Sequence, residues 1–492
     1  MTIDNVPLPD SLSEQVKRLA FYRERGIDPY DSSFRRTHAI EDIRENETVY
    51  LDTGKKVSVS GRVMALRRHG KAFFADLQDR SARIQIYAKK DNLAEEEFEI
   101  ARATDVGDLI GVTGSVFKTR TGELTVVAGT FVLLGKCLKP LPEKWHGLRD
   151  VEARYRRRYL DMIMNLEVRK IFYLRSRALR VMRNFLDDRG FLEVETPMMQ
   201  LLPGGALARP FKTFHNALGL DLFLRIAPEL FLKRLIVGGL EKVYEINRNF
   251  RNEGLSIRHN PEFTMLELYQ AFGNYETMLE LCEELLCFVV QTILKSLRIK
   301  YQGLDIDFTP PWTRINLRKS ILDASGIDIF EDSSEVMFFK AERAGMHVEK
   351  NWDRGKMINE LLEHFVQPHC VNPTFVLEYP VEISPLSRSK KNDPRVAERF
   401  ELFIGKEEIG NAYSELNDPI EQRKRFESQL YKREMGDYEA HLVDTDYLEA
   451  LEYGMPPTGG MGIGIDRLVM ILTDSSSIRE VILFPILRPR PD

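Results

Sequence analysis

A predicted hairpin carries an arginine, acids and aromatic rings at strand spacing. Residues 243–269 contain two alternating runs on either side of a polar turn, which predicts antiparallel strands. The two-residue period places Arg251 and Glu253 on one face of the first strand, and Phe263, Glu267 and Tyr269 on one face of the second. A guanidinium group binds phosphate oxygens through paired hydrogen bonds, and a ring can stack on a purine. This face therefore suits nucleotide binding, although a solvated strand face with surface ion pairs would have the same composition.

A glycine-rich strand supplies a second candidate cation. In GMGIGIDRLVMIL (residues 460–472), Gly460, Gly462 and Gly464 share one strand face, so a flat ligand or a backbone can approach closely. Arg467 follows at the start of a predicted amphipathic helix, where the helix dipole disfavours a cation and a phosphate would supply compensating charge. The alternative is a packing strand followed by a surface arginine.

Residues 399–417 (RFELFIGKEEIGNAYSELN) supply carboxylates around a predicted turn at Gly405. Glu401 and Glu408 flank this turn, so both can face one site. In nucleotide sites Mg²⁺ is bound by a few carboxylates together with phosphate oxygens. In isolation, two exposed acids on a hairpin would be the commoner interpretation of such a pair. Asn411 and Glu415 fall on one strand face by parity.

Three strings resemble the signature motifs of class II aminoacyl-tRNA synthetases. FRNEG followed by RHNPEFT resembles the second motif, GIGIDRL the third, and GFLEVETP (residues 190–197) the first. The resemblance implies that Arg251 bridges the ATP α-phosphate and the amino-acid carboxylate, and that Phe263 stacks on adenine. It also implies that Glu253 lies near the adenine amino group and His259 near the outer phosphates.

The same resemblance implies further roles. Arg467 binds the γ-phosphate of ATP, and Glu401 and Glu408 hold Mg²⁺. The first motif implies a homodimer with Pro197 at the core of its interface. No HIGH, KMSKS or P-loop string occurs in the chain, which disfavours a class I synthetase or a P-loop NTPase.

The amino-acid site resembles that of the lysyl family within class II. RIAPEL, NPEFTMLELY and NAYSELND match the lysyl enzymes more closely than the aspartyl and asparaginyl ones, which implies activation of L-lysine with ATP and transfer to the 3′ end of tRNA(Lys). Glu229 and Gly205 would contact the α-amino group, and Glu415 with Tyr269 the ε-amino group. A buried carboxylate without a cation is unfavourable, so apolar or acidic side chains would be rejected. The predicted lysine-binding set is Gly205, Glu229, Glu267, Tyr269, Asn411 and Glu415.

Short alternating segments between residues 57 and 134 predict a small barrel. Five strands, with a helix near residues 95–102 between the third and fourth, suit an OB-type fold. HGKAFFADLQD and TGELTV resemble the anticodon-binding barrel of the lysyl and aspartyl enzymes. The resemblance implies that Phe74 stacks on an anticodon base while Gln85 and Glu123 read base edges. On composition alone, the barrel core would be the commoner place for Phe74.

The chain that must position these residues has 492 residues. This is too long for one hydrophobic core, so more than one domain is expected. We predict an α+β fold with a helical segment at residues 1–50, an OB-type barrel at 51–138, a linker at 139–150 and a class II antiparallel sheet flanked by helices at 151–492. The net charge of −5 confines any RNA contact to local basic surface. Without a signal peptide, an apolar span or zinc-site cysteine spacing, a cytoplasmic enzyme is expected.

Three other functions are weighed against this one. An aspartyl or asparaginyl enzyme would aim a basic residue at the substrate side chain. A relative that lysylates a protein would lack the barrel. A non-catalytic RNA-binding protein would have lost ATP-binding residues, whereas Arg251, Glu401, Glu408 and Arg467 are all present. No side chain is identified as the base for the transfer step.

Overall fold

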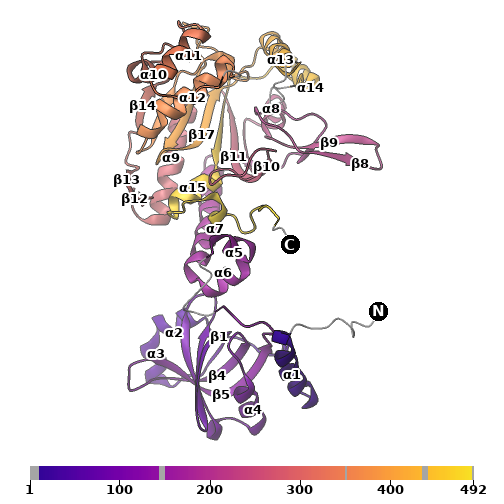
Figure 1. Cartoon of the computed structure of the whole chain (residues 1–492), viewed down its shortest axis with the longest axis vertical. Coiled ribbons are helices and arrows are strands. Elements are labelled where there is room, and N and C mark those ends of the chain that lie inside the picture. The colour runs from indigo at the N-terminus through magenta and orange to yellow at the C-terminus, as the bar shows by residue number, and fades with distance from the viewer. Residues whose placement is uncertain (1–9, 143–149, 350–351, 435–441, 490–492) are drawn as a thin grey trace. The chain divides into compact units, whose positions relative to one another are not determined.

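The computed structural model describes residues 10–142, 150–349, 352–434 and 442–489 (Figure 1). The chain divides into two compact units, Met1–Gly147 and Leu148–Asp492. The predicted linker at 139–150 falls at this division, and its residues 143–149 lie outside the described residues. No helix among the described residues is long and apolar enough to cross a membrane.

The first unit is a closed five-stranded barrel in the order β1-β2-β3-β5-β4, which confirms the predicted OB-type fold. Its strands are β1 (Val57–His69), β2 (Ala72–Gln78), β3 (Arg83–Lys89), β4 (Leu109–Lys118) and β5 (Leu124–Gly135). Neighbouring strands are antiparallel except β3 and β5, whose parallel pairing closes the barrel. The helices are α1 (Asp10–Glu24), α2 (Ile40–Glu45), α3 (Glu47–Thr53) and α4 (Glu95–Ala103), which lies between the third and fourth strands as predicted.

The second unit is built on an eight-stranded sheet in the order β14-β15-β16-β17-β18-β11-β10-β6. The pairs β14/β15 and β10/β6 are parallel, and the other neighbouring strands are antiparallel. Its strands are β6 (Leu192–Glu193), β10 (Lys242–Phe250), β11 (Glu262–Ala271), β14 (Thr313–Asn316), β15 (Thr374–Leu377), β16 (Arg399–Ile404), β17 (Glu407–Ser414) and β18 (Thr458–Gly464). Two small sheets, β7-β9-β8 and β12-β13, comprise β7 (Met199–Gln200), β8 (Lys212–His215), β9 (Leu220–Leu224), β12 (Arg298–Tyr301) and β13 (Leu304–Asp307).

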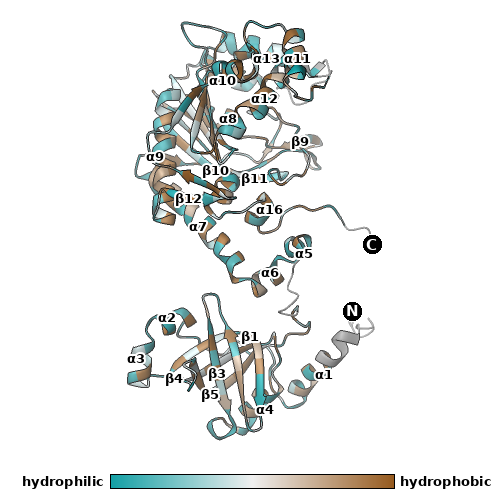
Figure 2. Ribbon diagram, turned by 60° about the vertical axis from the view of Figure 1, so that its left-hand side comes forward, coloured by the Kyte–Doolittle hydropathy of each residue, from teal (hydrophilic) through white to brown (hydrophobic). Residues whose placement is uncertain are grey.

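Helices cover the sheet as predicted for a class II synthetase domain. The helices described in this unit are α5 (Val151–Arg156), α6 (Arg158–Met164), α7 (Leu166–Asp187), α8 (Glu229–Val237), α9 (Tyr275–Leu294), α10 (Leu317–Ser325), α11 (Ser334–Arg343), α12 (Arg354–Phe365), α13 (Pro419–Glu434), α14 (Thr445–Glu452), α15 (Ile465–Leu472) and α16 (Ile478–Val481). Of these, α7, α8, α9, α10 and α15 pack against strands of the sheet. Figure 2 shows hydrophobic positions concentrated in the strands and along α9. The helical insert α10–α12 between β14 and β15 has a hydrophobic cluster of its own.

The two faces of the large sheet have different tasks. One face packs residues such as Leu266, Leu268, Ala412 and Ile463 against α7, α9 and α15 in the main hydrophobic core. Side chains of the opposite parity, including Met265, Glu267, Asn411 and Tyr413, line a cavity instead. The alternation of the strands therefore separates the core from the candidate site.

One sequence expectation about these elements was wrong. The first strand of the hairpin ends at Phe250, so Arg251 and Glu253 lie in the following connection and not on the strand face. Arg251 is still held at the sheet, because its backbone N–H donates to Pro261 O at 2.9 Å. The predicted helix after the glycine strand is present as α15 and is almost entirely buried: Ile465, Asp466 and residues 468–472 are buried, and within α15 Arg467 alone is partly exposed.

Candidate active site

Two adjoining cavities lie on the open face of the large sheet. The first, of about 760 Å³, is lined by Arg251, His259, Phe263, Glu408 and Arg467, among others. The second, of about 870 Å³, is lined by Glu229, Glu267, Tyr269 and further residues of β17, β18 and the segment at 383–387. Arg251, Met265 and Asn411 line both cavities, so a ligand extending from one into the other would pass these side chains.

Three arginines line the first cavity: Arg251, Arg258 and Arg467. Arg467 Nη1 donates to the backbone and side chain of Glu408 (2.8 Å to O and 3.1 Å to Oε2), and its Nη2 lies 3.2 Å from His259 Nε2. The guanidinium carbon of Arg251 lies 5.1 Å from the centre of the Phe263 ring. Arg251 Nε is buried and has no hydrogen-bond partner within the described ranges, so it is available to an anionic ligand.

The start of α15 is tied to the neighbouring strand. Asp466 accepts a hydrogen bond from the backbone N–H of Thr264 at 2.7 Å and forms an ion pair with Arg175 at 2.6 Å. This contact fixes the position of the adjacent Arg467. Burial, and then the charge of Arg467, lower the pKa of His259 from its usual range. His259 is therefore mainly neutral near pH 7 and adds polarity to the cavity without adding a full positive charge to those of the arginines.

The second cavity is acidic. Glu229, the first residue of α8, accepts hydrogen bonds from Tyr413 Oη at 2.6 Å and from Lys233 Nζ at 2.5 Å. Burial, and then the nearby Glu229, raise the pKa of Glu267 to about 8. Gly205 has a positive φ of 88°, and a Cβ there would lie 2.8 Å from Glu229 Cβ. Glycine at this position leaves room for a group to approach Glu229.

Five of the six predicted lysine-binding residues line this cavity: Gly205, Glu229, Glu267, Tyr269 and Asn411. Glu415 is not among its lining residues. Its side chain is fully buried and forms an ion pair with Lys233, beneath Gly460. A Cβ on Gly460 would lie 1.9 Å from Glu415 Oε1 and 2.6 Å from the Tyr269 ring. Glu415 Oε1 accepts no hydrogen bond from the described residues, so an additional donor can be accommodated there.

Glu401 and Glu408 lie close enough to interact, although a bulge separates them. Glu401 pairs with Asn411 across the strands, Glu408 pairs with Phe403, and the register shifts between them. Burial raises the pKa of Glu401; the charge of Arg399 lowers it and that of Glu408 raises it again. No group of three or more His, Cys, Asp or Glu residues suited to a metal occurs in the ranges described. Glu408 lines the first cavity, whereas Glu401 lines neither cavity and accepts hydrogen bonds from Tyr379 and Arg399. A magnesium ion bound by both carboxylates and by substrate phosphate oxygens would share Glu401 with these two donors.

The barrel presents an aromatic patch on its outer face. Phe73 belongs to the barrel core, whereas Phe74 points away from it and stacks on Tyr87, with ring centres 4.8 Å apart. Gln85 lies next to this pair, opposite Asp76 and Thr125 in the strand register, and accepts a hydrogen bond from Thr125 Oγ1 at 3.0 Å. Glu123, just before β5, is exposed and forms an ion pair with Arg44 at 3.5 Å. The alternative interpretation, that Phe74 fills the core, is therefore wrong.

Several residues of the site were not found from the sequence. Tyr413 shares the parity of Asn411 and could have been found from it. Lys233 follows Glu229 by one helical turn, the spacing at which oppositely charged side chains meet. The segment at 383–387 and Tyr87 have no signal in the local sequence pattern.

The fold and the cavities are those of a class II aminoacyl-tRNA synthetase joined to an OB-fold barrel. Residues 150–488 match the family "tRNA synthetases class II (D, K and N)", and residues 57–134 match "OB-fold nucleic acid binding domain". The first match covers more than half of the chain, so the chain belongs to this class.

Curated relatives narrow the family further. Lysine–tRNA ligases of Syntrophomonas wolfei and Carboxydothermus hydrogenoformans are each 54% identical, over 97% and 99% of this chain and 96% and 100% of their own. The lysine–tRNA ligase of Pelotomaculum thermopropionicum is 56% identical over 96% of this chain and 94% of its own. The chain is a member of the lysine–tRNA ligase family.

Proposed function

We propose that this protein is a lysine–tRNA ligase, which activates L-lysine with ATP to lysyl-adenylate and transfers the lysyl group to the 3′ end of tRNA(Lys). The observation that carries the proposal is the junction of the two cavities, where guanidinium groups adjoin buried carboxylates. Phosphates suit the first cavity and a substrate with two ammonium groups suits the second. Family membership agrees with this chemistry.

Catalysis of the first step rests on positioning and on stabilisation of charge. The lysine carboxylate oxygen forms a bond to the α-phosphorus while the bond to the pyrophosphate oxygen breaks. Arg251, which lines both cavities, is assigned to the α-phosphate and the carboxylate, and Arg467 to the γ-phosphate. Phe263 provides a ring for adenine, Glu253 the contact to its amino group, and His259 a contact to the outer phosphates.

Glu401 and Glu408 are the proposed ligands of Mg²⁺, which would neutralise the phosphate charge that develops during the reaction. The mutual repulsion of the two carboxylates supports this assignment, because a divalent cation relieves it.

The amino-acid cavity favours lysine over aspartate or asparagine. Glu229 is assigned to the α-ammonium group, with Gly205 beside it, and Glu415 with Tyr269 to the ε-ammonium group. Glu267 and Asn411 complete the wall. An aspartate side chain here would face carboxylates in a buried environment. Unless one of the carboxylates were protonated, this would be unfavourable by roughly several kcal/mol.

The second step joins the lysyl group to tRNA. A terminal ribose hydroxyl oxygen forms a bond to the adenylate carbonyl carbon, and AMP leaves with the electrons of the broken mixed-anhydride bond. No side chain is assigned as base. Phe74, Gln85 and Glu123 on the barrel are assigned to the anticodon, where stacking and edge hydrogen bonds read single-stranded bases.

We further propose that the protein is a homodimer that acts in the cytoplasm. The region from β6 to the residue after β7 exposes Leu192, Met198, Met199 and Leu201, each by 48% or more of its surface. Exposed apolar side chains clustered in this way are typical of an interface. Sedimentation equilibrium at micromolar concentration tests this; a monomer at every concentration would contradict it.

The activity is tested by amino-acid-dependent exchange of labelled pyrophosphate into ATP. Lysine should stimulate exchange and aspartate should not, and tRNA with a UUU anticodon should be charged. Arg251→Ala should lower lysyl-adenylate formation by about 100-fold or more, since it removes a group that stabilises the developing charge. Persistence within tenfold of the wild-type rate would contradict the role of Arg251, and stimulation by aspartate alone would contradict the substrate.

A further inference from the structure

A fully buried lysine lies beneath the amino-acid cavity. Lys233, on α8, has a side-chain exposure of 0% and ion pairs with both Glu229 (2.5 Å) and Glu415. It is not among the residues that line the cavity. Two of the carboxylates assigned to lysine are thus already bound to a cation of the protein itself.

The groups around Lys233 come from three elements. Glu229 precedes it by one turn of α8, and Glu415 follows the end of β17. The ring of Tyr413 on β17 lies 5.5 Å from the ammonium nitrogen, and that of Tyr447 on α14 lies 6.0 Å from it. Further out, Glu267 interacts electrostatically with Glu229 and Glu415. The ammonium group therefore lies where α8, the end of β17 and α14 meet.

The charge count of this cluster matches the substrate. Glu229, Glu267 and Glu415 with Lys233 carry a formal charge of −2 when all four are ionised. Lysine has two ammonium groups, and its carboxylate is assigned to Arg251. Without Lys233 the three carboxylates would face the same two ammonium groups with a charge of −3 and would repel one another in a buried site.

Burial by itself would favour the neutral forms of the side chains in this cluster. Burial lowers the pKa of Lys233, but the carboxylates of Glu229 and Glu415 outweigh it and leave this pKa raised, so the side chain stays charged. Burial raises the pKa of Glu415, and the Lys233 ammonium opposes that shift. The lysine thus favours the ionised carboxylate that an incoming ammonium group requires.

We propose that Lys233 is a positioning residue for amino-acid recognition: its buried ammonium group holds the Glu229 and Glu415 side chains in place for the two ammonium groups of the substrate. The inference rests on the proposed function. Lys233 acts through the two carboxylates and need not touch lysine. The competing explanation is that Lys233 is only an internal ion pair that stabilises the fold.

The barrel contains a matched control. Lys136 also has a side-chain exposure of 0% and pairs with two acids, Asp105 at 2.7 Å and Asp108 at 2.8 Å. It belongs to the other compact unit. Lys136→Met therefore removes the same kind of buried cation from a unit that does not bind the amino acid. Because pyrophosphate exchange needs no tRNA, a change in the barrel should not affect this assay.

The experiment compares wild-type protein with Lys233→Met, Lys233→Gln and Lys136→Met in pyrophosphate exchange. For both Lys233 variants the KM for lysine should rise about tenfold or more near pH 7, since one partner of a buried charge cluster is removed. The KM for ATP should stay within twofold, which also reports an intact fold. Lys233→Gln retains hydrogen-bond donors without charge, so it remains informative if the methionine variant does not fold.

The pH profile separates the two explanations. Loss of the ammonium group raises the pKa of the neighbouring carboxylates, so the rising limb of kcat/KM for lysine should move to higher pH between about pH 6 and 8.5. Lys136→Met should leave this limb and the KM for lysine unchanged, even if it lowers the melting temperature. An unchanged KM for lysine, or equal increases in KM for lysine and ATP with an unmoved limb, would overturn the proposal. Absence of lysine-dependent exchange in the wild type would instead overturn the proposed function.

Discussion

Glu267 is a buried acid whose state of ionisation depends on pH near neutrality. It is 5% exposed, accepts a hydrogen bond from Asn249 Nδ2 at 3.3 Å, and lines the amino-acid cavity. Burial is the largest cause of its raised pKa of about 8, followed by the charge of Glu229. Without a bound cation the carboxyl group is therefore largely protonated at pH 7, and an ammonium group entering the cavity favours its ionised form.

Replacing Glu267 by glutamine should flatten the pH dependence of stability. A raised pKa in the folded protein means that the folded state binds more protons than the unfolded state. The stabilisation by Glu267 is thus fully present below 4.5, the pKa of this side chain in the unfolded state. It is lost as the pH rises to about 8, the pKa in the folded state. Between about pH 5 and 8 the loss for this one group is on the order of 3 kcal/mol. Thermal unfolding across this range checks it; parallel curves for both proteins would contradict it.

At the scale of single residues, the sequence pattern identified which side chains belong to the site better than it identified the groups that surround them. Parity alone grouped Glu267 with Tyr269 and Asn411 with Glu415, because side-chain direction alternates along a strand. It did not show that Glu415 lies beneath the cavity wall with Lys233. A lysine in a helix is usually solvated, but the packing of α8 against β10, β11 and α14 buries this one beside Tyr413 of β17.

At the scale of elements, the backbone of β18 lies close to the side chains around the acidic cavity. A Cβ on Gly460 would meet Glu415 Oε1 at 1.9 Å and the Tyr269 ring at 2.6 Å, both in constrained positions. A Cβ on Gly462, on the same strand face, would meet only the flexible end of Met265 within 3.4 Å, at 3.1 Å. The two glycines thus lie on the same strand face but differ in the space available for a methyl group, which makes them a matched pair for substitution.

Gly460→Ala should raise the KM for lysine by about tenfold or more, because the methyl group displaces two side chains assigned to the ε-ammonium group. Gly462→Ala should change it by less than about threefold, since the Met265 side chain can move. Pyrophosphate exchange at saturating ATP measures both. Equal effects of the two substitutions would show that the strand, and not the Glu415 side of the cavity, responds to the added methyl group.

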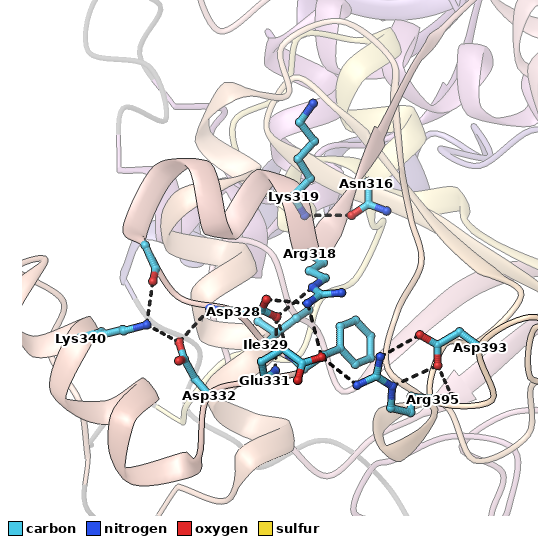
Figure 3. A network of polar contacts seen from close by, with 12 residues as sticks. Asn316, Arg318, Lys319, Asp328, Ile329, Glu331, Asp332, Lys340, Asp393 and Arg395 are labelled. Carbon is cyan, nitrogen blue, oxygen red and sulfur yellow. Dashed lines mark hydrogen bonds and ion pairs between the residues drawn. The ribbon is translucent and has the colours of Figure 1, made fainter.

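A charged network connects the insert α10–α12 to the segment that precedes β16 (Figure 3). Arg395 donates to Glu331 at 3.0 Å and to both carboxylate oxygens of Asp393. Arg318 binds Asp328 through two hydrogen bonds of 2.8 and 2.6 Å. Residues 384–387, earlier in the segment, line the amino-acid cavity. The network therefore attaches one wall of that cavity to the insert.

Arg395→Ala should weaken lysine binding in a salt-dependent way. The Arg395 side chain is 52% exposed, so little change in melting temperature is expected. At low ionic strength the KM for lysine should rise about two- to threefold, and the difference should fade near 0.5 M salt as the charges are screened. Arg298→Ala, which removes an exposed ion pair with Asp307 in β12-β13, is the control. A salt-independent effect would mean that lost packing against Phe330, and not charge, is responsible.

Element types were more predictable than their ends. Alternation identified the barrel strands and the hairpin of β10 and β11, because a half-buried sheet requires that pattern. The end of β10 at Phe250 was not predictable, since the extended pattern continues past it. Pro261, which accepts from the Arg251 N–H, has no N–H to continue the ladder, and the next N–H, that of Asn252, donates to Arg209 O at 2.8 Å instead.

For the molecule as a whole, the two units separate two tasks. The barrel has its own hydrophobic core, and the residues assigned to lysine and ATP all lie in the other unit. A barrel was foreseeable from the change to short alternating segments near residue 57. Which of Phe73 and Phe74 faces outward was not settled by the composition of the segment, because it depends on the register of β2 with β1 and β3.

Phe74→Ala should impair charging of tRNA without impairing activation of lysine. Phe74 and Tyr87 form a stacked pair on the outer face of the barrel, and loss of one stacking ring costs about 1–3 kcal/mol, or roughly a 5- to 150-fold decrease in kcat/KM for tRNA. Pyrophosphate exchange without tRNA should stay within twofold of wild type, since the ATP and lysine cavities belong to the other unit. Tyr30→Ala removes an aromatic side chain that is 46% exposed in the barrel unit, away from the strands, and should affect neither reaction. Equal loss of both activities in Phe74→Ala would mean that the ring supports the fold, and unchanged charging would remove Phe74 from the anticodon site.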